Sequence, residues 1–300
     1  MLTFHPLSIE DGPWIRELTF ASGTQSADFN FGSMFLWDKR YRQEVCRRGE
    51  RVAALACSGE HPIFPFPVGT GELESVIEEM REYAEIMGFP FEIRGVEQEH
   101  IELLESLFPG RFTITEDRDS SDYIYLAESL ATLSGKKLHA KRNFINRFIQ
   151  THGDWSFKKL EHEDFPACLR LLERWDESET ATGGSVAGER DAVLRALSHY
   201  DTLGLLGGAL YTGGELIAFT IGEPLSRESF DVHFEKADAS IDGAYPMVNR
   251  EFVRLVLSEY PDMKYINRED DMGLDNLRQS KLSYHPDHLL MKHTAHWRNA

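Results

Sequence analysis

One short pattern recurs after half of the chain length, and this recurrence limits the folds that the chain can adopt. Residues 2–18 read LTFHPLSIEDGPWIREL, and residues 155–171 read WSFKKLEHEDFPACLRL. Identical residues lie 153 positions apart at pairs that include Phe4 and Phe157, Leu7 and Leu160, Glu10 and Glu163, Asp11 and Asp164, and Pro13 and Pro166. Both segments predict a strand, an Asp N-cap, a Pro in the first turn and a helix. Helix starts of this kind are often alike, but a spacing of half the chain favours a duplicated domain of about 150 residues.

The rest of each half follows a similar order. In the first half we predict strands at 51–57, 61–67, 89–94, 111–115 and 122–126, with helices at 72–87 and 100–107. In the second half we predict strands at 205–211, 215–222, 229–235, 264–267 and 288–293, with helices at 246–259 and 274–282. This is an α+β pattern, and it lacks the regular alternation of a dinucleotide fold. Neither GxGxxG nor GxxxxGK[ST] occurs, so we expect no Rossmann or P-loop site.

Composition narrows the function classes. Of the 300 residues, 50 are acidic and 32 are Lys or Arg, which gives a net charge of −18 and opposes general nucleic-acid binding. The 3 cysteines are too few for a disulfide framework and form no CxxC pair. The chain begins without the basic and apolar regions of a signal peptide, and we find no transmembrane segment. We therefore expect a cytoplasmic protein.

A basic segment, residues 129–153, lies between the halves and contains no acidic residue. We predict an amphipathic connecting helix whose apolar face includes Leu138, Ile145, Phe148 and Ile149. One interpretation is that its charges balance acidic neighbours across a domain interface. The other is a cradle for a phosphorylated ligand, such as CoA, a lipid head group or the acceptor end of a tRNA. The candidate anion contacts are Lys136, Lys137, Lys141 and Arg142.

The predicted strand at 229–235 carries several titratable groups. Strict alternation would place Val232, Phe234 and Lys236 on one face, and Asp231, His233 and Glu235 on the other. Such groups are costly to bury unless they are paired or functional, although a solvated face would also explain them. Just before the next helix, Asp242 and Gly243 form a candidate anion-binding turn.

Polar residues also follow the predicted strand at 264–267. Asn267, Arg268 and Asp270 are candidates for substrate orientation at a cleft rim. We expect no metal site, because the consecutive acids 269–271 point in different directions. Near the end of the next helix lie Lys281, Tyr284 and His285, which suit acid–base and substrate-binding roles, although Lys281 and His285 also complement a helix dipole.

Several runs resemble a bacterial family named for the C-terminal domain of phosphatidylglycerol lysyltransferase. They are SGKKLHAKRNFINRF, GALYTGGELIAFTIGEPL, DVHFEKAD, DGAYPMVNREF, YINREDDMG and LRQSKLSYHP. The resemblance implies two tandem GNAT-like (acyl-CoA N-acyltransferase) domains, each a mixed, mostly antiparallel sheet flanked by helices. Better-known relatives transfer an aminoacyl group from aminoacyl-tRNA, whereas GNAT enzymes use acyl-CoA. We place an N-terminal GNAT-like domain at 1–128 and a C-terminal one at 154–300.

The resulting hypothesis is an acyl- or aminoacyl-transferase that acts on an amine or hydroxyl acceptor. Its catalytic candidates are His233, Glu235, Tyr284 and Lys281, and backbone N–H groups of the strand would stabilise the oxyanion. The donor would be acyl-CoA or aminoacyl-tRNA, and the sequence identifies no other cofactor. The usual Q/RxxGxG/A pyrophosphate turn of GNAT enzymes is reduced to a single Gly243. The alternative is therefore a non-catalytic binding module that kept the fold, or a protein that contacts tRNA without transfer.

Overall fold

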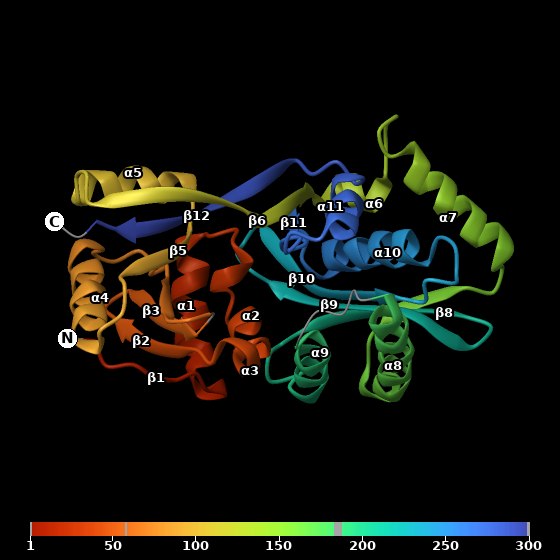
Figure 1. Ribbon diagram of the computed structural model, residues 1–300. Helices are drawn as coiled ribbons and strands as arrows, with labels where there is room; N and C mark the ends of the chain where they lie inside the picture. The colour runs from red at the N-terminus through yellow and green to blue at the C-terminus, as the bar shows by residue number, and fades with distance from the viewer. Residues whose placement is uncertain (1, 58, 183–187, 299–300) are drawn as a thin grey trace. The chain divides into compact units, whose positions relative to one another are not determined.

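The computed structural model describes residues 2–57, 59–182 and 188–298, and it divides the chain into two compact units (Figure 1). Unit 1 comprises the residues up to Asp122, Asp270–Asp275 and the residues from Leu289 onward. Unit 2 comprises Tyr123–Glu269 and Asn276–His288. The predicted domains are contiguous, whereas each unit is built from more than one stretch of chain. The predicted domain boundaries therefore stay a prediction.

Unit 1 is a mixed sheet with helices. Its strands lie in the order β1-β2-β3-β4-β5-β12-β6, and within this order β4 and β5 pair in parallel. Its elements are β1 (His5–Pro6), η1 (Ile9–Asp11), α1 (Gly12–Ser22), η2 (Ala27–Phe29), α2 (Phe31–Leu36), α3 (Asp38–Tyr41), β2 (Glu44–Arg48), β3 (Arg51–Cys57), β4 (Pro62–Pro65), α4 (Glu74–Met87), β5 (Glu92–Val96), α5 (Gln98–Leu107), most of β6 (Phe112–Leu126) and most of β12 (His288–Trp297).

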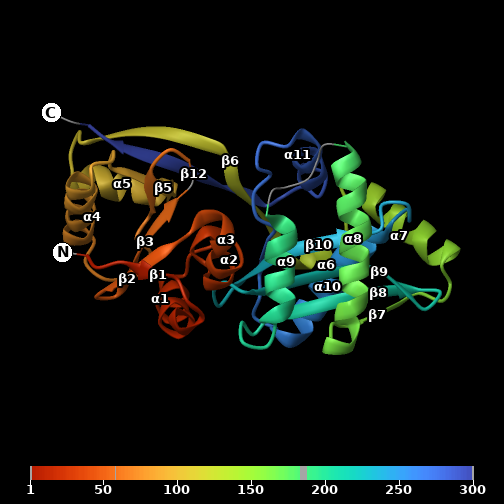
Figure 2. The same ribbon diagram turned by 60° about the horizontal axis from the view of Figure 1, so that its bottom comes forward.

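The strands of unit 2 lie in the order β6-β11-β10-β9-β8-β7, and only the β10–β11 pair is parallel among the described pairings. Helix α10 packs on β8, β9 and β10, and Figure 2 shows α8 and α9 on the same sheet. Its elements are α6 (Ala127–Thr132), α7 (His139–Thr151), β7 (Ser156–Lys159), η3 (His162–Asp164), α8 (Phe165–Thr182), α9 (Glu189–Ser198), β8 (Leu206–Thr212), β9 (Glu215–Pro224), β10 (Ser229–Ala237), α10 (Ala244–Glu259), β11 (Tyr265–Asn267) and α11 (Asp275–Leu282). Mixed sheets flanked by helices confirm the predicted α+β class.

The repeated motif has the same local structure in both units. In each, a short strand leads into a 3₁₀ turn and then a helix. The carboxylate of Asp11 accepts the backbone N–H of Ser8 at 2.9 Å, and that of Asp164 accepts the N–H of Glu161 at 3.0 Å. Both carboxylates bond backward along the chain and thereby fix the entry into the helix. The sequence echo therefore marks positions with the same structural task.

A β-bulge in β10 corrects the predicted alternation. Asp231 lies opposite Glu223, but Glu235 lies opposite Thr220, because the register shifts between Val232 and Phe234. The strand carries one extra residue there, so Glu235 turns to the opposite face of the sheet from Asp231. The prediction that Asp231, His233 and Glu235 share one face is wrong for this reason.

Two other segments differ from the sequence prediction. The strands expected at 111–115 and 122–126 are one long strand, β6, whose polar middle section is extended and partly exposed. The connecting helix expected over 129–153 is two helices, α6 and α7, separated by a turn in which Leu133 has a φ of 51°. Leu138, Ile145 and Phe148 are buried in a cluster with residues of α10, whereas Ile149 is exposed.

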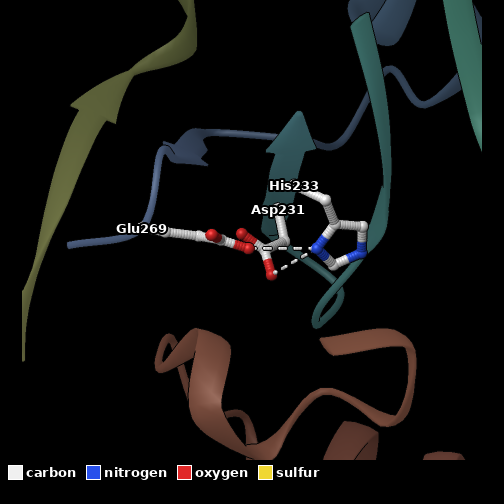
Figure 3. Close-up of side chains that lie close together, drawn as sticks. All are labelled: Asp231, His233 and Glu269. Carbon is white, nitrogen blue, oxygen red and sulfur yellow. Dashed lines mark hydrogen bonds and ion pairs between the residues drawn. The ribbon is translucent and has the colours of Figure 1, made fainter. Parts of the chain in front are cut away.

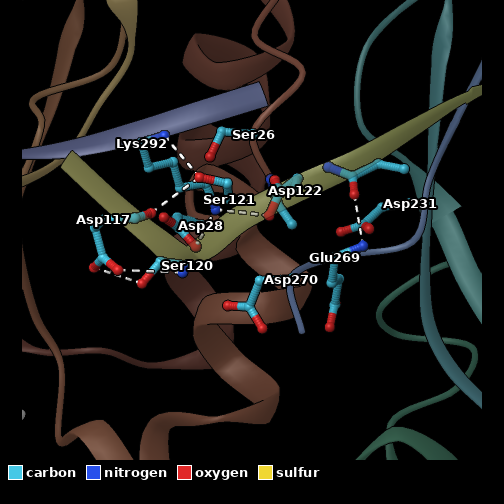
Figure 4. A network of polar contacts seen from close by, with 12 residues as sticks. Ser26, Asp28, Asp117, Ser120, Ser121, Asp122, Asp231, Glu269, Asp270 and Lys292 are labelled. Atoms are coloured by element: carbon cyan, nitrogen blue, oxygen red, sulfur yellow. Dashed lines mark hydrogen bonds and ion pairs between the residues drawn. The ribbon is translucent and has the colours of Figure 1, made fainter. Parts of the chain in front are cut away.

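Unit 1 buries a lysine between carboxylates (Figure 4). The Lys292 ammonium lies 2.8 Å from Asp122 Oδ1 and 2.9 Å from Asp28 Oδ1. Lys292 and Asp122 are each 1% exposed, and the other oxygen of Asp122 accepts the N–H of Ala27 at 2.9 Å. Burial alone would lower the pKa of Lys292, but the two carboxylates hold it above its ordinary value. The pair ties β12 to the end of the β6 segment of this unit.

The carboxyl of Glu97, at the start of α5, makes the stability of unit 1 depend on pH. Burial raises its pKa to about 7, although Thr24 Oγ1 donates a hydrogen bond to it. An unfolded glutamate has a pKa of about 4.3, so folding favours the protonated form between these values. This contribution to stability is fully present below about pH 4 and is lost as the pH rises toward 7.

We therefore expect Glu97→Gln to raise the free energy of unfolding by about 2–3 kcal/mol at pH 8 and by at most about 1 kcal/mol at pH 5. Urea unfolding at the two pH values measures this difference. Glu99→Gln is the matched control, because it removes the same charge from an 81% exposed side chain of the same helix. An equal effect of Glu97→Gln at both pH values would contradict the assignment.

Candidate functional site

A group of polar and aromatic side chains surrounds Arg268 in unit 2. We call Glu235, Arg268, Tyr284, Lys141 and Asn249 the Arg268 cluster. Arg268 follows β11, and its parallel neighbour β10 supplies Glu235. Arg268 Nη2 donates to Glu235 Oε1 at 2.8 Å, and both side chains are nearly buried. The Arg268 guanidinium and the Lys141 ammonium lie 4.9 Å and 4.0 Å from the centroid of the Tyr284 ring.

Two buried polar atoms of this cluster are left without a hydrogen-bond partner among the described residues. Asn249 Nδ2, on α10, donates to Glu235 Oε2 at 2.8 Å, so both carboxylate oxygens are engaged. Arg268 Nη1 and Asn249 Oδ1 are buried, and neither has a hydrogen-bond partner among the described residues. Buried donors and acceptors are normally satisfied. The cluster therefore holds one unsatisfied donor and one unsatisfied acceptor.

The electrostatics of the cluster favour a negative ligand. Burial lowers the pKa of Lys141 to about 8, and the neighbouring Arg268 adds to this effect. Burial also raises the pKa of Tyr284 despite Arg268, so the phenol stays protonated at neutral pH. Burial opposes the charge of Arg268, but Glu235 outweighs it and the pKa of Arg268 is raised. Two cations thus face one carboxylate near neutral pH, in a chain that is strongly acidic overall.

The end of α11 holds the backbone at Arg268 in place. Lys281 Nζ donates to the carbonyl oxygen of Arg268 at 2.6 Å. The hydroxyl of Tyr125, on β6, donates to the carbonyl oxygen of Lys281 at 2.8 Å. Lys281 therefore acts on Arg268 through its main chain, and Tyr125 fixes the end of the helix that carries Lys281.

A second group, the His233 cluster, consists of Glu223, Asp231, His233 and Glu269. Figure 3 shows Asp231 and Glu269 converging on one ring nitrogen of His233. Nδ1 lies 3.1 Å from Glu269 Oε1 and 3.6 Å from Asp231 Oδ2, and Nε2 lies 3.1 Å from Glu223 Oε1. Burial alone would lower the pKa of His233, but Asp231, Glu223 and Glu269 hold it well above its ordinary value.

The ligand types of Asp231, His233 and Glu269 suit a metal ion, and their ligand atoms lie within 4.8 Å of one another. The sequence prediction of no metal site considered only the consecutive acids 269–271. Folding instead brings Glu269 to two residues of β10, which spacing along the chain does not reveal. The bulge at His233 places this cluster on the opposite face of the sheet from Glu235.

Of the predicted site residues, Glu235, Tyr284, Lys281, Arg268 and Lys141 come together. His233 belongs to the other cluster, and Asn267 Oδ1 accepts the N–H of Glu269 at 2.6 Å. His285 is exposed after α11 and Asp270 belongs to unit 1.

The predicted basic cradle is dispersed. Lys136 and Lys137 are exposed in the turn before α7. Arg142 Nη1 donates to the carbonyl oxygens of Leu133 and Gly135, which gives it a role in that turn. Asp242 makes an exposed ion pair with Arg147 at 3.3 Å.

The predicted anion-binding turn is crowded by α7. Gly243 has a φ of 86°, and a Cβ on it would lie 2.7 Å from the carbonyl oxygen of Phe144. The glycine thus permits the close approach of α7 to the start of α10. A carbonyl oxygen at this position also opposes an anion there.

Sequence reasoning missed Asn249, Tyr125 and Glu223 as members of these clusters. Glu223 offered a signal, because it is a lone carboxylate at the end of an apolar strand. Asn249 lies on the buried side of α10, where one amide among Met247, Val248 and Phe252 is a weak signal. Tyr125 alternates with apolar residues and resembles an ordinary core residue.

The chain matches the family described as "Phosphatidylglycerol lysyltransferase, C-terminal" over residues 20–296. It belongs to this family. A solved protein of unknown function from Bacteroides thetaiotaomicron is 37% identical, with a TM-score of 0.94 over 99% of this chain and 100% of that one. L-PGS from Bacillus licheniformis is 16% identical, with a TM-score of 0.68 over 98% of this chain and 93% of that one.

A tandem GNAT protein from the clavulanic acid pathway, 12% identical, covers 100% of both chains with a TM-score of 0.51. These structures confirm the predicted fold. An uncharacterized protein of Mycoplasmoides gallisepticum is 26% identical over 178 residues, which are 58% of this chain and 55% of that protein. The match thus spans about half of that relative. Among the described helices of our chain, none has the length and apolarity needed to cross a membrane.

Proposed function

We propose that this lysyltransferase-family chain transfers an aminoacyl group from aminoacyl-tRNA to an amine or hydroxyl acceptor, at the Arg268 cluster. The observation that supports this most is the buried guanidinium of Arg268, which has a donor, Nη1, without a hydrogen-bond partner among the described residues. An uncharged carbonyl becomes an oxyanion when a nucleophile attacks it. A fixed cationic donor in a buried position stabilises that charge more than it stabilises the ground state.

In the proposed reaction the acceptor forms a bond to the carbonyl carbon, and the ester bond to the tRNA ribose breaks. The proton of the acceptor ends on the ribose hydroxyl. Arg268 Nη1 and the Lys141 ammonium stabilise the oxyanion, and Tyr284 is a neutral hydroxyl donor because its pKa is raised. Glu235 and Lys281 are positioning residues, because they hold the guanidinium and the main chain of Arg268. His233 has no role in this step.

Two observations favour an aminoacyl ester over acyl-CoA as the donor. The turn before α10 lacks the glycine pattern of a pyrophosphate site. In the structure, Phe144 of α7 approaches Gly243 so closely that its carbonyl oxygen faces the turn. The family description, which names a lysyltransferase, agrees with this preference.

The experiment is a thermal shift measured with lysine-charged tRNA, uncharged tRNA and acetyl-CoA, at low and moderate salt. A ligand at about 100 times its Kd stabilises the folded chain by about 2.7 kcal/mol, which gives a clear rise in Tm. We expect a larger shift with charged than with uncharged tRNA. Release of labelled lysine from the tRNA should then depend on an added acceptor, with phosphatidylglycerol vesicles and free amines as the first two tested.

The other outcomes decide against the proposal. A shift with acetyl-CoA alone would make the chain an acyl-CoA transferase. Equal shifts with charged and uncharged tRNA, without release of lysine, would indicate tRNA contact without transfer. No shift with any of the three would favour a binding module that kept the fold.

A further inference from the structure

Three side chains of the His233 cluster place possible metal-ligand atoms close together. Nδ1 of His233 lies 3.1 Å from Glu269 Oε1 and 3.6 Å from Asp231 Oδ2 (Figure 3). Ligand atoms that surround one Zn²⁺ ion at about 2.0–2.2 Å lie about 3.0–3.5 Å from one another. Two of the three separations lie close to this range, and the three atoms all lie within 4.8 Å of one another.

A carboxylate also lies beside the other ring nitrogen of the histidine. The other ring nitrogen of His233, Nε2, lies 3.1 Å from Glu223 Oε1, and both side chains are almost fully buried. A histidine that binds a metal through one nitrogen usually donates a hydrogen bond from the other to a carboxylate. Glu223 occupies that position. With a metal ion in place of the proton on Nδ1, Glu223 would keep the remaining ring proton on Nε2.

The backbone brings these ligands together at an irregular point of the sheet. His233 is the bulged residue of β10 and Asp231 lies two residues before it, whereas Glu269, which follows β11, has a φ of 54°. Bulges redirect side chains and occur often beside functional sites. Regular alternation would also have placed Glu235 on this face, but the bulge separates it from the cluster.

The buried carboxylates of the His233 cluster also favour a bound cation. The side chains of Asp231 and His233 are 0% exposed, that of Glu223 is 3% exposed and that of Glu269 is 24% exposed. Carboxylate side chains at such buried positions are costly unless positive charge lies close to them. A divalent cation held by Asp231, His233 and Glu269 would supply positive charge at this point.

We propose that Asp231, His233 and Glu269 bind a divalent transition-metal ion, and that Glu223 accepts a hydrogen bond from Nε2 of His233 and orients its ring. Mixed imidazole and carboxylate ligands suit Zn²⁺ and Mn²⁺ better than Mg²⁺ or Cu⁺. The ion would join β10 to Glu269, the residue directly after Arg268, so it would also fix the main chain beside the guanidinium. The assignment does not depend on the proposed transfer reaction, because it is tested by bound metal.

The experiment is metal analysis of the full chain by mass spectrometry. The chain is stripped with a chelator, given one equivalent of Zn²⁺ or Mn²⁺ and desalted. We expect about one ion per chain for the wild type. His233→Gln and Glu269→Gln should each lower the retained metal at least about 10-fold, and Glu223→Gln should weaken affinity about 10- to 100-fold.

His162→Gln is the matched control. His162 faces Asp201 at 2.9 Å, but both side chains are well exposed, so this histidine–carboxylate pair should contribute nothing to retention. Circular dichroism shows whether each variant is folded, and the wild-type stoichiometry tests the site even if His233→Gln does not fold. Fewer than about one ion per ten wild-type chains would overturn the proposal. So would full retention by folded Glu269→Gln, or an equal loss in His162→Gln.

Discussion

Replacing Lys292 with Met should lower the free energy of unfolding of unit 1 by about 3–5 kcal/mol. The ammonium of Lys292 lies within 2.9 Å of two carboxylates, and Asp122, one of them, is 1% exposed. Methionine has a similar volume, so the packing of the chain stem is largely kept. The loss comes from the carboxylate of Asp122, which stays buried and no longer has the Lys292 ammonium beside it. Denaturant unfolding followed by circular dichroism measures the change.

Two further variants separate this cause from a packing defect. Lys264→Met breaks an exposed ion pair with Glu228, and we expect it to cost less than about 1 kcal/mol. Adding Asp122→Asn to Lys292→Met removes the buried charge but keeps an oxygen for the N–H of Ala27. This double variant should recover part of the lost stability. A double variant that is less stable than Lys292→Met would show that the buried charge is not the main cost.

The sequence allowed the fold to be predicted where local signals agree with one another. In the hairpin of β8 and β9, Gly213 and Gly214 both have positive φ, as a tight turn requires, and apolar runs flank them. Asp11 and Asp164 mark equivalent helix starts because their short side chains bond to the backbone within three residues. Such interactions join residues that are close in the sequence, so the sequence alone predicts them.

The candidate site was only partly predictable, because its geometry depends on a non-local register. Arg268 and Tyr284 stood out as polar groups near strand and helix ends. The partner of each residue on β10, however, depends on one bulged residue, His233, which sends Glu235 and Asp231 to opposite faces. No periodic pattern in the sequence records that shift. If the side chains of β10 alternated strictly between the two faces, the residues of both clusters would lie on one face. The sequence prediction therefore places His233 together with Glu235.

Arg268→Lys should reduce kcat/KM for aminoacyl transfer at least about 100-fold, and it should leave the chain folded. Lysine keeps a positive charge near Glu235, so the carboxylate is not left unpaired. It cannot supply a second, geometrically fixed donor, because an ammonium lacks the planar fork of a guanidinium. The variant therefore removes the donor at Nη1 while it preserves a positive charge beside Glu235.

Arg147→Lys is the control with the same chemical change. Arg147 lies on α7 and is 60% exposed, with an exposed Asp242 as its partner, so transfer should stay within about twofold of the wild type. Unfolding curves of both variants exclude loss of structure as the cause. The separate effects on kcat and KM are also informative. Loss of a donor that acts on the oxyanion lowers kcat, whereas loss of a donor that only binds the substrate raises KM. If Arg268→Lys transfers at the wild-type rate, the guanidinium is not the oxyanion donor, and the two cations of the cluster serve binding alone.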